Sequence, residues 1–156
     1  YAKEHPVEVR FIEKMPIGMG KACQGKSRDE LLELLEKALG NAEPYEKHLG
    51  NGPAEYVSFS GFQGRIGFIS AVSHKFCDSC NRIRLTAEGY LKLCLQYESG
   101  IDLRKLLRSG ATDEELKEAM RQAIWKKPAC HNFSDERRDE EVGQKKEHRA
   151  MYGIGG

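Results

Sequence analysis

Three cysteines within one short segment have the spacing of a thiolate metal site. Cys77 and Cys80 form a Cys-x2-Cys pair, and Cys94 follows after 13 intervening residues in the run FCDSCNRIRLTAEGYLKLC. Thiolates are the usual ligands of structural zinc ions and of iron–sulfur clusters, so this segment predicts a metal or iron–sulfur site. The pattern itself contains no fourth ligand, which leaves the nature of the metal open.

The chain between the second and third cysteines must fold back for the sulfurs to meet. Its apolar residues alternate with polar ones in two short runs, which predicts a hairpin in which Ile83 faces Leu93. The same register sets Leu85 opposite Leu91, because a slip by one residue would set leucines against arginines. The remaining loop has three residues and ends at Gly89, where a left-handed conformation is commonly required.

The predicted register also places two arginines beside the sulfurs. Cys94 stands opposite Arg82, on the polar strand face that also carries Arg84. Guanidinium groups bind phosphate through paired hydrogen bonds, so an iron–sulfur cluster with one open iron beside them would form a pocket for a phosphorylated ligand. The arginines therefore favour a [4Fe–4S] cluster held by Cys77, Cys80 and Cys94.

A closed zinc site is the alternative, since Cys-x2-Cys pairs are common in zinc knuckles. It needs a fourth ligand, which His74, Cys130 or His131 could supply. An Arg-x-Arg pair in a hairpin is often simply solvated, so the arginines alone do not decide between the two sites. A zinc knuckle would indicate a non-enzymatic module that binds nucleic acid or protein.

Composition and charge limit the partners of this chain. Its 25 Lys and Arg nearly balance its 24 Asp and Glu, and beyond the pairs 82/84 and 126/127 no continuous basic stripe is visible. We therefore expect neither nucleic acid nor membrane as a partner. No apolar run reaches the roughly 20 residues of a membrane span, and the first residues lack the apolar stretch of a secretory signal.

Cysteine usage bears on the compartment. Five cysteines, three of them at metal-ligand spacing, fit a reducing environment better than a disulfide framework, so a cytoplasmic protein is expected. The sequence assigns no role to Cys23, and none to Cys130 beyond that of a possible fourth zinc ligand.

Patterning upstream of the cysteines predicts a strand and then a helix. Side chains alternate over 7–13 with the two-residue period of a strand. After a Pro/Gly loop, Ser27 and Glu30 form the capping box of a leucine-rich helix that should end at Gly40. The segment 41–53 is rich in turn residues and is expected to be a loop.

The rest of the chain predicts a second hairpin, two helices and a tail. Runs 55–60 and 65–70 flank a Gly-x-x-Gly turn, as in a hairpin. A short helix is expected over 102–108, and Thr112 begins another that ends before Pro128. The segment beyond 130 has blocks of charge without apolar periodicity, so we expect it to be mobile or ordered only by a partner surface.

Taken together, these motifs resemble the C-terminal half of the molybdenum cofactor biosynthesis protein A family, radical S-adenosylmethionine enzymes with GTP 3′,8-cyclase activity. The resemblance covers nearly the whole chain, and the cysteine segment is its most specific part. It rests on RFIEKMPIG at 10–18, GFIS at 67–70, FCDSCNRIRLT at 76–86, GYLKLCL at 89–95 and IGG at 154–156.

The resemblance implies a reaction and its cofactors. The parent enzyme would convert GTP to (8S)-3′,8-cyclo-7,8-dihydroguanosine 5′-triphosphate in molybdenum cofactor biosynthesis. The three cysteines would hold a second, substrate-side [4Fe–4S] cluster whose open iron takes the guanine base. The family's first cluster, in a Cys-x3-Cys-x2-Cys loop, has no counterpart in this sequence. This chain alone is therefore expected to be inactive and to share S-adenosylmethionine with a missing N-terminal half.

The resemblance also implies roles for single residues. Arg82, Ile83 and Arg84 would contact GTP, Arg10 would face the substrate cavity, and Met15 would touch S-adenosylmethionine. Catalytic roles would belong to the two hairpin arginines and to a terminal Gly-Gly that reaches the active site. Three of these residues or segments have a simpler alternative. Arg10 could be a salt-bridged strand arginine, Met15 a residue that only packs in its loop, and the terminal glycines a frayed chain end. The residues with implied catalytic roles are Arg82, Arg84, Gly155 and Gly156.

The fold implied is α+β, in three parts. Residues 1–40 would be the last strand and helix of an incomplete TIM-type barrel, 41–130 a mostly antiparallel cluster-binding region with helices, and 131–156 a polar tail ending in Gly-Gly. The chain has no initial methionine and enters a strand almost at once, so a fragment is expected. Without barrel neighbours its first strand would be exposed or paired anew, and a homodimer is one expected outcome.

Overall fold

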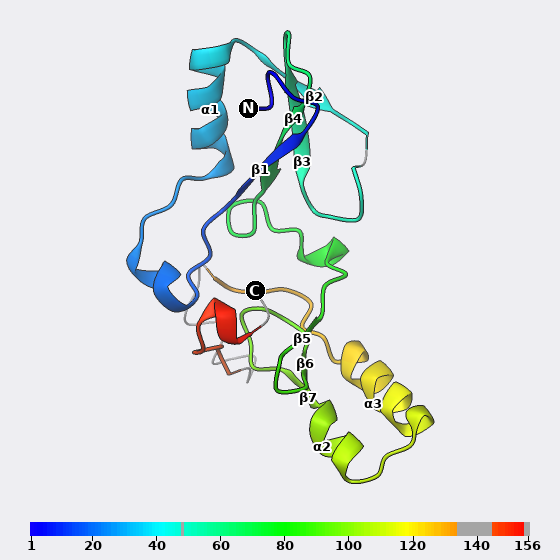
Figure 1. Ribbon diagram of the computed structural model, residues 1–156. Helices are drawn as coiled ribbons and strands as arrows, with labels where there is room; N and C mark the ends of the chain where they lie inside the picture. The colour runs from blue at the N-terminus through cyan, green and yellow to red at the C-terminus, as the bar shows by residue number, and fades with distance from the viewer. Residues whose placement is uncertain (48, 134–144, 155–156) are drawn as a thin grey trace. The chain divides into compact units, whose positions relative to one another are not determined.

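The computed structural model of the protein describes residues 1–47, 49–133 and 145–154. Within these ranges it contains two β-sheets and three α-helices (Figure 1), which confirms the α+β class. The chain forms two compact units, Tyr1–Met15 with Cys23–Ser79 and Pro16–Ala22 with Cys80–Gly156. The origin of residues 1–40 in a barrel remains a prediction. In the described part of the chain, no helix has the length and apolar character needed to span a membrane.

The first unit is built on a four-stranded sheet with the order β1-β4-β3-β2. Strands β3 and β4 form the predicted antiparallel hairpin, and β1 pairs in parallel with β4 at the edge of the sheet. The first strand is thus paired within its own chain. The strands are β1 (Glu8–Ile12), β2 (Ala42–Tyr45), β3 (Glu55–Phe59) and β4 (Arg65–Ile69).

The expectation of a loop throughout 41–53 is wrong for its first residues. Strand β2 lies there and pairs antiparallel with β3, with Pro44 opposite Val57. Proline lacks a backbone donor and is tolerated in strands mainly at sheet edges, and β2 is an edge strand. The proline that made the segment resemble a turn is therefore compatible with its position.

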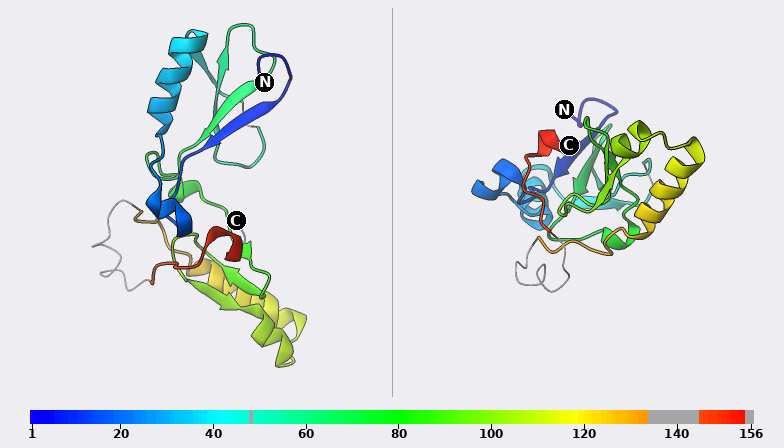
Figure 2. Two further views of the ribbon diagram at one scale, coloured as in Figure 1. Left: turned by 60° about the vertical axis from the view of Figure 1, so that its left-hand side comes forward. Right: turned by 90° about the horizontal axis from the view of Figure 1, so that it is seen from below.

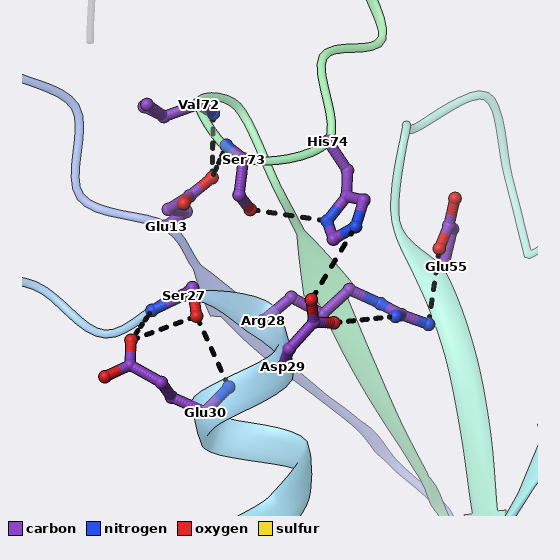
Figure 3. A network of polar contacts seen from close by, with 9 residues as sticks. All are labelled: Glu13, Ser27, Arg28, Asp29, Glu30, Glu55, Val72, Ser73 and His74. Carbon is purple, nitrogen blue, oxygen red and sulfur yellow. Dashed lines mark hydrogen bonds and ion pairs between the residues drawn. The ribbon is translucent and has the colours of Figure 1, made fainter. Parts of the chain in front are cut away.

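Helix α1 (Arg28–Leu39) covers one face of this sheet. Its predicted capping box is confirmed, since the backbone N–H of Ser27 donates to Glu30 at 2.8 Å and the N–H of Glu30 donates back to the serine hydroxyl at 3.3 Å (Figure 3). Gly40 ends the helix with φ +91°, a conformation that favours glycine. Side chains of α1 pack against a buried cluster of the sheet; they are Leu31, Leu32 and Leu35, and the cluster contains Ala2, Val57, Phe59, Ile66 and Phe68.

The second unit contains a three-stranded antiparallel sheet with the order β5-β6-β7. Two helices lie beside it (Figure 2), α2 in contact with β6 and α3 in contact with β7. Both helices were predicted, and Thr112 caps α3 through the expected capping box. The elements are β5 (Arg84–Leu85), β6 (Tyr90–Lys92), β7 (Gly100–Asp102), α2 (Leu103–Arg108) and α3 (Asp113–Trp125).

The described end of the chain, 145–154, packs on this second unit. The N–H of Glu147 donates to the Gln96 carbonyl at 2.6 Å, and the Glu147 carboxylate pairs with Lys92. Ile154 has no exposed surface. The expectation that the tail is ordered only by a partner is therefore wrong for these residues, because a buried lysine of the same unit binds their carboxylate. Residues 134–144, 155 and 156 lie outside the described part.

Candidate cluster-binding site

The hairpin that carries the cysteines has the predicted register. In the antiparallel pairing of β5 with β6, Arg84 lies opposite Lys92 and Leu85 lies opposite Leu91. This agreement follows from the alternation of apolar and polar side chains, which has a period of two along a strand.

The loop of the hairpin also follows the prediction. Thr86 and Tyr90 close it through a backbone hydrogen bond of 2.9 Å, and Gly89 adopts φ +80°. A Cβ atom at this glycine would lie 2.8 Å from the Cβ of Arg104, so both the backbone conformation and the available space favour glycine here.

Burial of the hairpin differs from the expected pattern of two matched apolar faces. Leu91 and Leu93 are each 3% exposed, whereas Leu85 is 62% exposed and Ile83 39% exposed. Strand β6 lies at the centre of its sheet and is contacted by helix α2, so its side chains are the ones that become buried. Strand β5 lies at the edge of its sheet.

Four predicted site residues of the second unit come together on this hairpin. Arg84 is half-buried, and burial, followed by the charge of Arg82, lowers its pKa. The sulfurs of Cys80 and Cys94 raise the pKa of Arg84, so both lie within electrostatic range of its guanidinium group. Two of the three predicted sulfurs thus act on Arg84 together with Arg82.

The surroundings of Cys80 favour its thiolate form. Burial opposes ionisation, but a backbone hydrogen bond from Arg82 and the positive charges of Lys127 and Arg82 outweigh it and lower the pKa of the thiol below its ordinary value. The thiolate is the form that binds metals and iron–sulfur clusters.

Lys127 is a residue of this site that the sequence indicated only as part of a basic pair. Its Nζ donates to the carbonyl oxygen of Leu93 at 2.8 Å and of Arg82 at 3.0 Å, and it lies 3.6 Å from the sulfur of Cys80. In the sequence it is one of two adjacent lysines before Pro128, which indicate only the end of a helix.

Cys77 begins a 3-10 turn, Cys77–Ser79, in the first unit. The loop before it is held by Glu13, whose carboxylate accepts hydrogen bonds from the N–H groups of Val72 at 2.7 Å and Ser73 at 2.9 Å (Figure 3). Cys77 and the other two cysteines belong to different units, so the meeting of all three sulfurs stays a prediction.

The suggested fourth ligands of a zinc site are placed as follows. His74 lies 3.8 Å from Asp29 in the first unit, and in the second unit Cys130 is exposed while the ring of His131 lies against Phe133 at 4.3 Å between centroids.

Comparison with known proteins bears on the same segment. Residues 7–133 match the family described as Molybdenum Cofactor Synthesis C. The chain belongs to this family. The match includes all three cysteines and both hairpin arginines, so the residues singled out by their chemistry lie within the family's own domain.

Proteins named GTP 3′,8-cyclase are similar to this member of the family over most of its length. The protein from Clostridium perfringens strain 13 is 46% identical over 155 residues, which cover 99% of this chain. Those from Syntrophomonas wolfei and Cyanothece are 40% and 41% identical over 99% and 95% of the chain. The matched region is 46% of the Clostridium protein, so the chain spans about half the length of these relatives.

The remaining predicted site residues lie away from the cysteine hairpin along the chain. Arg10 donates from Nε to the hydroxyl of Tyr56 at 2.6 Å, and its guanidinium lies over that ring, so it has a partner within its own sheet. Met15 is half-buried at the end of a segment of the first unit. Gly155 and Gly156 lie outside the described residues.

Proposed function

We propose that this chain is the GTP-binding, C-terminal half of a GTP 3′,8-cyclase of molybdenum cofactor biosynthesis. The observation that carries the proposal is the grouping of Cys80 and Cys94 with Arg82 and Arg84 on one hairpin. It supports the proposal because the hairpin lies in a chain whose relatives bear that name over nearly its whole length.

Cys77, Cys80 and Cys94 would hold a [4Fe–4S] cluster. The donors fit such a group, because all three are half-buried thiols and Cys80 has a lowered pKa beside two positive charges. When bound, a cluster with three protein ligands supplies an open iron that can take the guanine base.

The two arginines would bind and orient the triphosphate. Arg82 and Arg84 are both half-buried, and hydrogen bonds between a guanidinium and phosphate are stronger where water is partly excluded. Their proximity to the sulfurs would fix the distance between the phosphates and the base-binding position. Ile83 between them is exposed and would contact the nucleoside.

The other half of the enzyme would provide the radical chemistry. S-adenosylmethionine would be bound there and touched by Met15, Arg10 would face the substrate cavity, and Gly155–Gly156 would reach into it. Because this sequence lacks the cysteines of a second cluster, the chain alone would bind GTP without converting it.

Anaerobic reconstitution of the chain with iron and sulfide tests this function. We expect a brown protein absorbing at about 400 nm, and the loss of that absorbance when the three cysteines are replaced by serine. GTP added to the reconstituted chain should perturb the cluster spectrum. A colourless protein holding about one zinc per chain would instead indicate the zinc-knuckle module.

A further inference from the structure

The strand pairing of the hairpin does not extend to the sulfurs. The ladder between β5 and β6 contains only the pairs of Arg84 with Lys92 and of Leu85 with Leu91. Cys80 precedes the ladder and Cys94 follows it along the chain. The separation of the two cysteine-bearing segments must therefore be set by contacts other than regular strand pairing.

The ammonium group of Lys127 bridges these two segments. It donates to the Arg82 carbonyl at 3.0 Å, two residues after Cys80, and to the Leu93 carbonyl at 2.8 Å, directly before Cys94. Its third short contact is with the Cys80 sulfur at 3.6 Å. A lysine ammonium has three donors, and these contacts account for all of them.

Helix α3 anchors the backbone of Lys127. The N–H of Lys127 donates to the Ile124 carbonyl at 3.0 Å, which continues the last turn of the helix. Pro128 follows and cannot continue it. Within the helix Ala123 is buried, and α3 contacts β7. The lysine thus extends from a packed element toward the hairpin.

We propose that Lys127 is a positioning residue for the cluster site. It sets the separation of Cys80 and Cys94 by joining the two backbone segments that carry them, and it places a positive charge beside a thiolate ligand. This inference rests on the proposed function, because it takes those cysteines as cluster ligands.

Replacing the lysine separates its two effects. Lys127→Met keeps the apolar stem but removes the donors and the charge, which leaves two carbonyl groups of the hairpin without this partner. Lys127→Arg keeps the charge with a different reach. Lys126→Met is the matched control, because Lys126 is an exposed lysine next in sequence.

The first measurement uses the metal-free chain. Backbone hydrogen exchange in peptides covering 80–84 and 92–96 should become faster in Lys127→Met, while Lys126→Met should match the parent. Thermal unfolding of each variant serves as the check on folding. Unchanged exchange in Lys127→Met would overturn the bridging role.

The second measurement uses the chain reconstituted with iron and sulfide. We expect Lys127→Met to lose its cluster to a chelator about 10-fold faster than the parent, the lower end of the effects seen when groups that orient metal ligands are removed. The reduction potential should become more negative, because a positive charge beside the cluster stabilises its reduced form. Lys127→Arg should keep a potential near that of the parent.

The outcomes distinguish this inference from the function on which it rests. If the parent binds a cluster and Lys127→Met matches Lys126→Met in retention and potential, the positioning role is wrong and the proposed function stands. If Lys127→Arg shows the potential of the neutral variant, the role of charge is wrong. If the parent and the triple cysteine variant both fail to bind a cluster, the proposed function fails and this inference with it.

Discussion

The Nζ of Lys92 lies 2.5 Å from Oε2 of Glu147, and neither side chain has any exposed surface. Arg149 donates to the second carboxylate oxygen at 3.0 Å, and Lys92 also donates to the carbonyl of Tyr97. The pair joins strand β6 of the cysteine hairpin to residues 145–154. It thereby fixes the described end of the chain on the unit that carries Cys80 and Cys94.

Breaking this pair should destabilise the protein strongly. Lys92→Met leaves the Glu147 carboxylate buried with Arg149 as its remaining cationic partner, and removing one member of a buried ion pair costs about 3–5 kcal/mol. We expect a loss near the lower end of that range in the free energy of unfolding by urea. Lys105→Met, on the exposed face of α2, is the control and should change it by less than about 0.5 kcal/mol. An additive cost in the double variant Lys92→Met/Glu147→Met would show that the two residues do not interact.

The same carboxylate should make stability depend on pH in the acid range. Burial opposes its ionisation, but hydrogen bonds from Arg149 and Lys92 outweigh burial and lower the pKa of Glu147 from 4.5 to about 2. A group with a lowered folded-state pKa contributes stability above its unfolded pKa and loses it as the pH falls toward the folded value. The contribution, on the order of 3 kcal/mol, should therefore be present at neutral pH and disappear between about pH 4.5 and 2.

The measurement is the free energy of unfolding by urea from pH 7 to pH 2.5, in the parent and in Glu147→Gln. Other carboxylates titrate in both proteins, so the difference between the two curves isolates Glu147. Parallel curves through the acid range would show that Glu147 does not cause the loss of stability.

Glu13 should control the order of the loop that leads to Cys77. Its carboxylate accepts hydrogen bonds from the N–H groups of Val72 and Ser73, so truncating it removes the acceptor of both groups. Glu13→Ala should lower the free energy of unfolding by about 1–3 kcal/mol and speed hydrogen exchange over 71–76. Glu13→Gln retains an acceptor oxygen, so its free energy of unfolding and its exchange rate should lie between those of the parent and of Glu13→Ala. Glu8→Ala, an exposed glutamate of β1, is the control; equal exchange in all variants would refute this role.

Arg84 should contribute to GTP affinity through the phosphates. A hydrogen bond to a charged group is worth about 1.5–3 kcal/mol, so Arg84→Ala should weaken GTP binding to the reconstituted chain by roughly 10- to 100-fold. Calorimetric titration with GTP and then with guanosine separates the phosphate contribution, because guanosine binding should change little. Arg108→Ala, exposed on α2, provides a control of equal charge. An equal loss for guanosine would argue against a phosphate contact.

Short-range signals account for the parts of the fold that could be predicted. The capping boxes of α1 and α3 each depend on residues three apart, and the register of the cysteine hairpin depends on alternation within a few residues of a turn. Gly89 was identified in the same way, because the loop length itself requires a left-handed residue. The three cysteines and two arginines could be singled out because their residue types and spacing carry the chemistry directly.

Contacts between distant residues were decided by the tertiary structure. Three such contacts leave no local pattern in the sequence. They are the parallel pairing of β1 with β4, the bridge from Lys127 to carbonyls 34 and 45 residues earlier, and the pair of Lys92 with Glu147, 55 residues apart. A lysine in a strand of alternating polar and apolar residues predicts a solvated side chain. Burial of Lys92 is favourable only because the carboxylate of Glu147, from a distant segment, pairs with it. The sequence alone thus determined the candidate ligands and the hairpin that holds two of them. Packing decided which charges surround them, because that depends on which distant segments fill the space beside the hairpin.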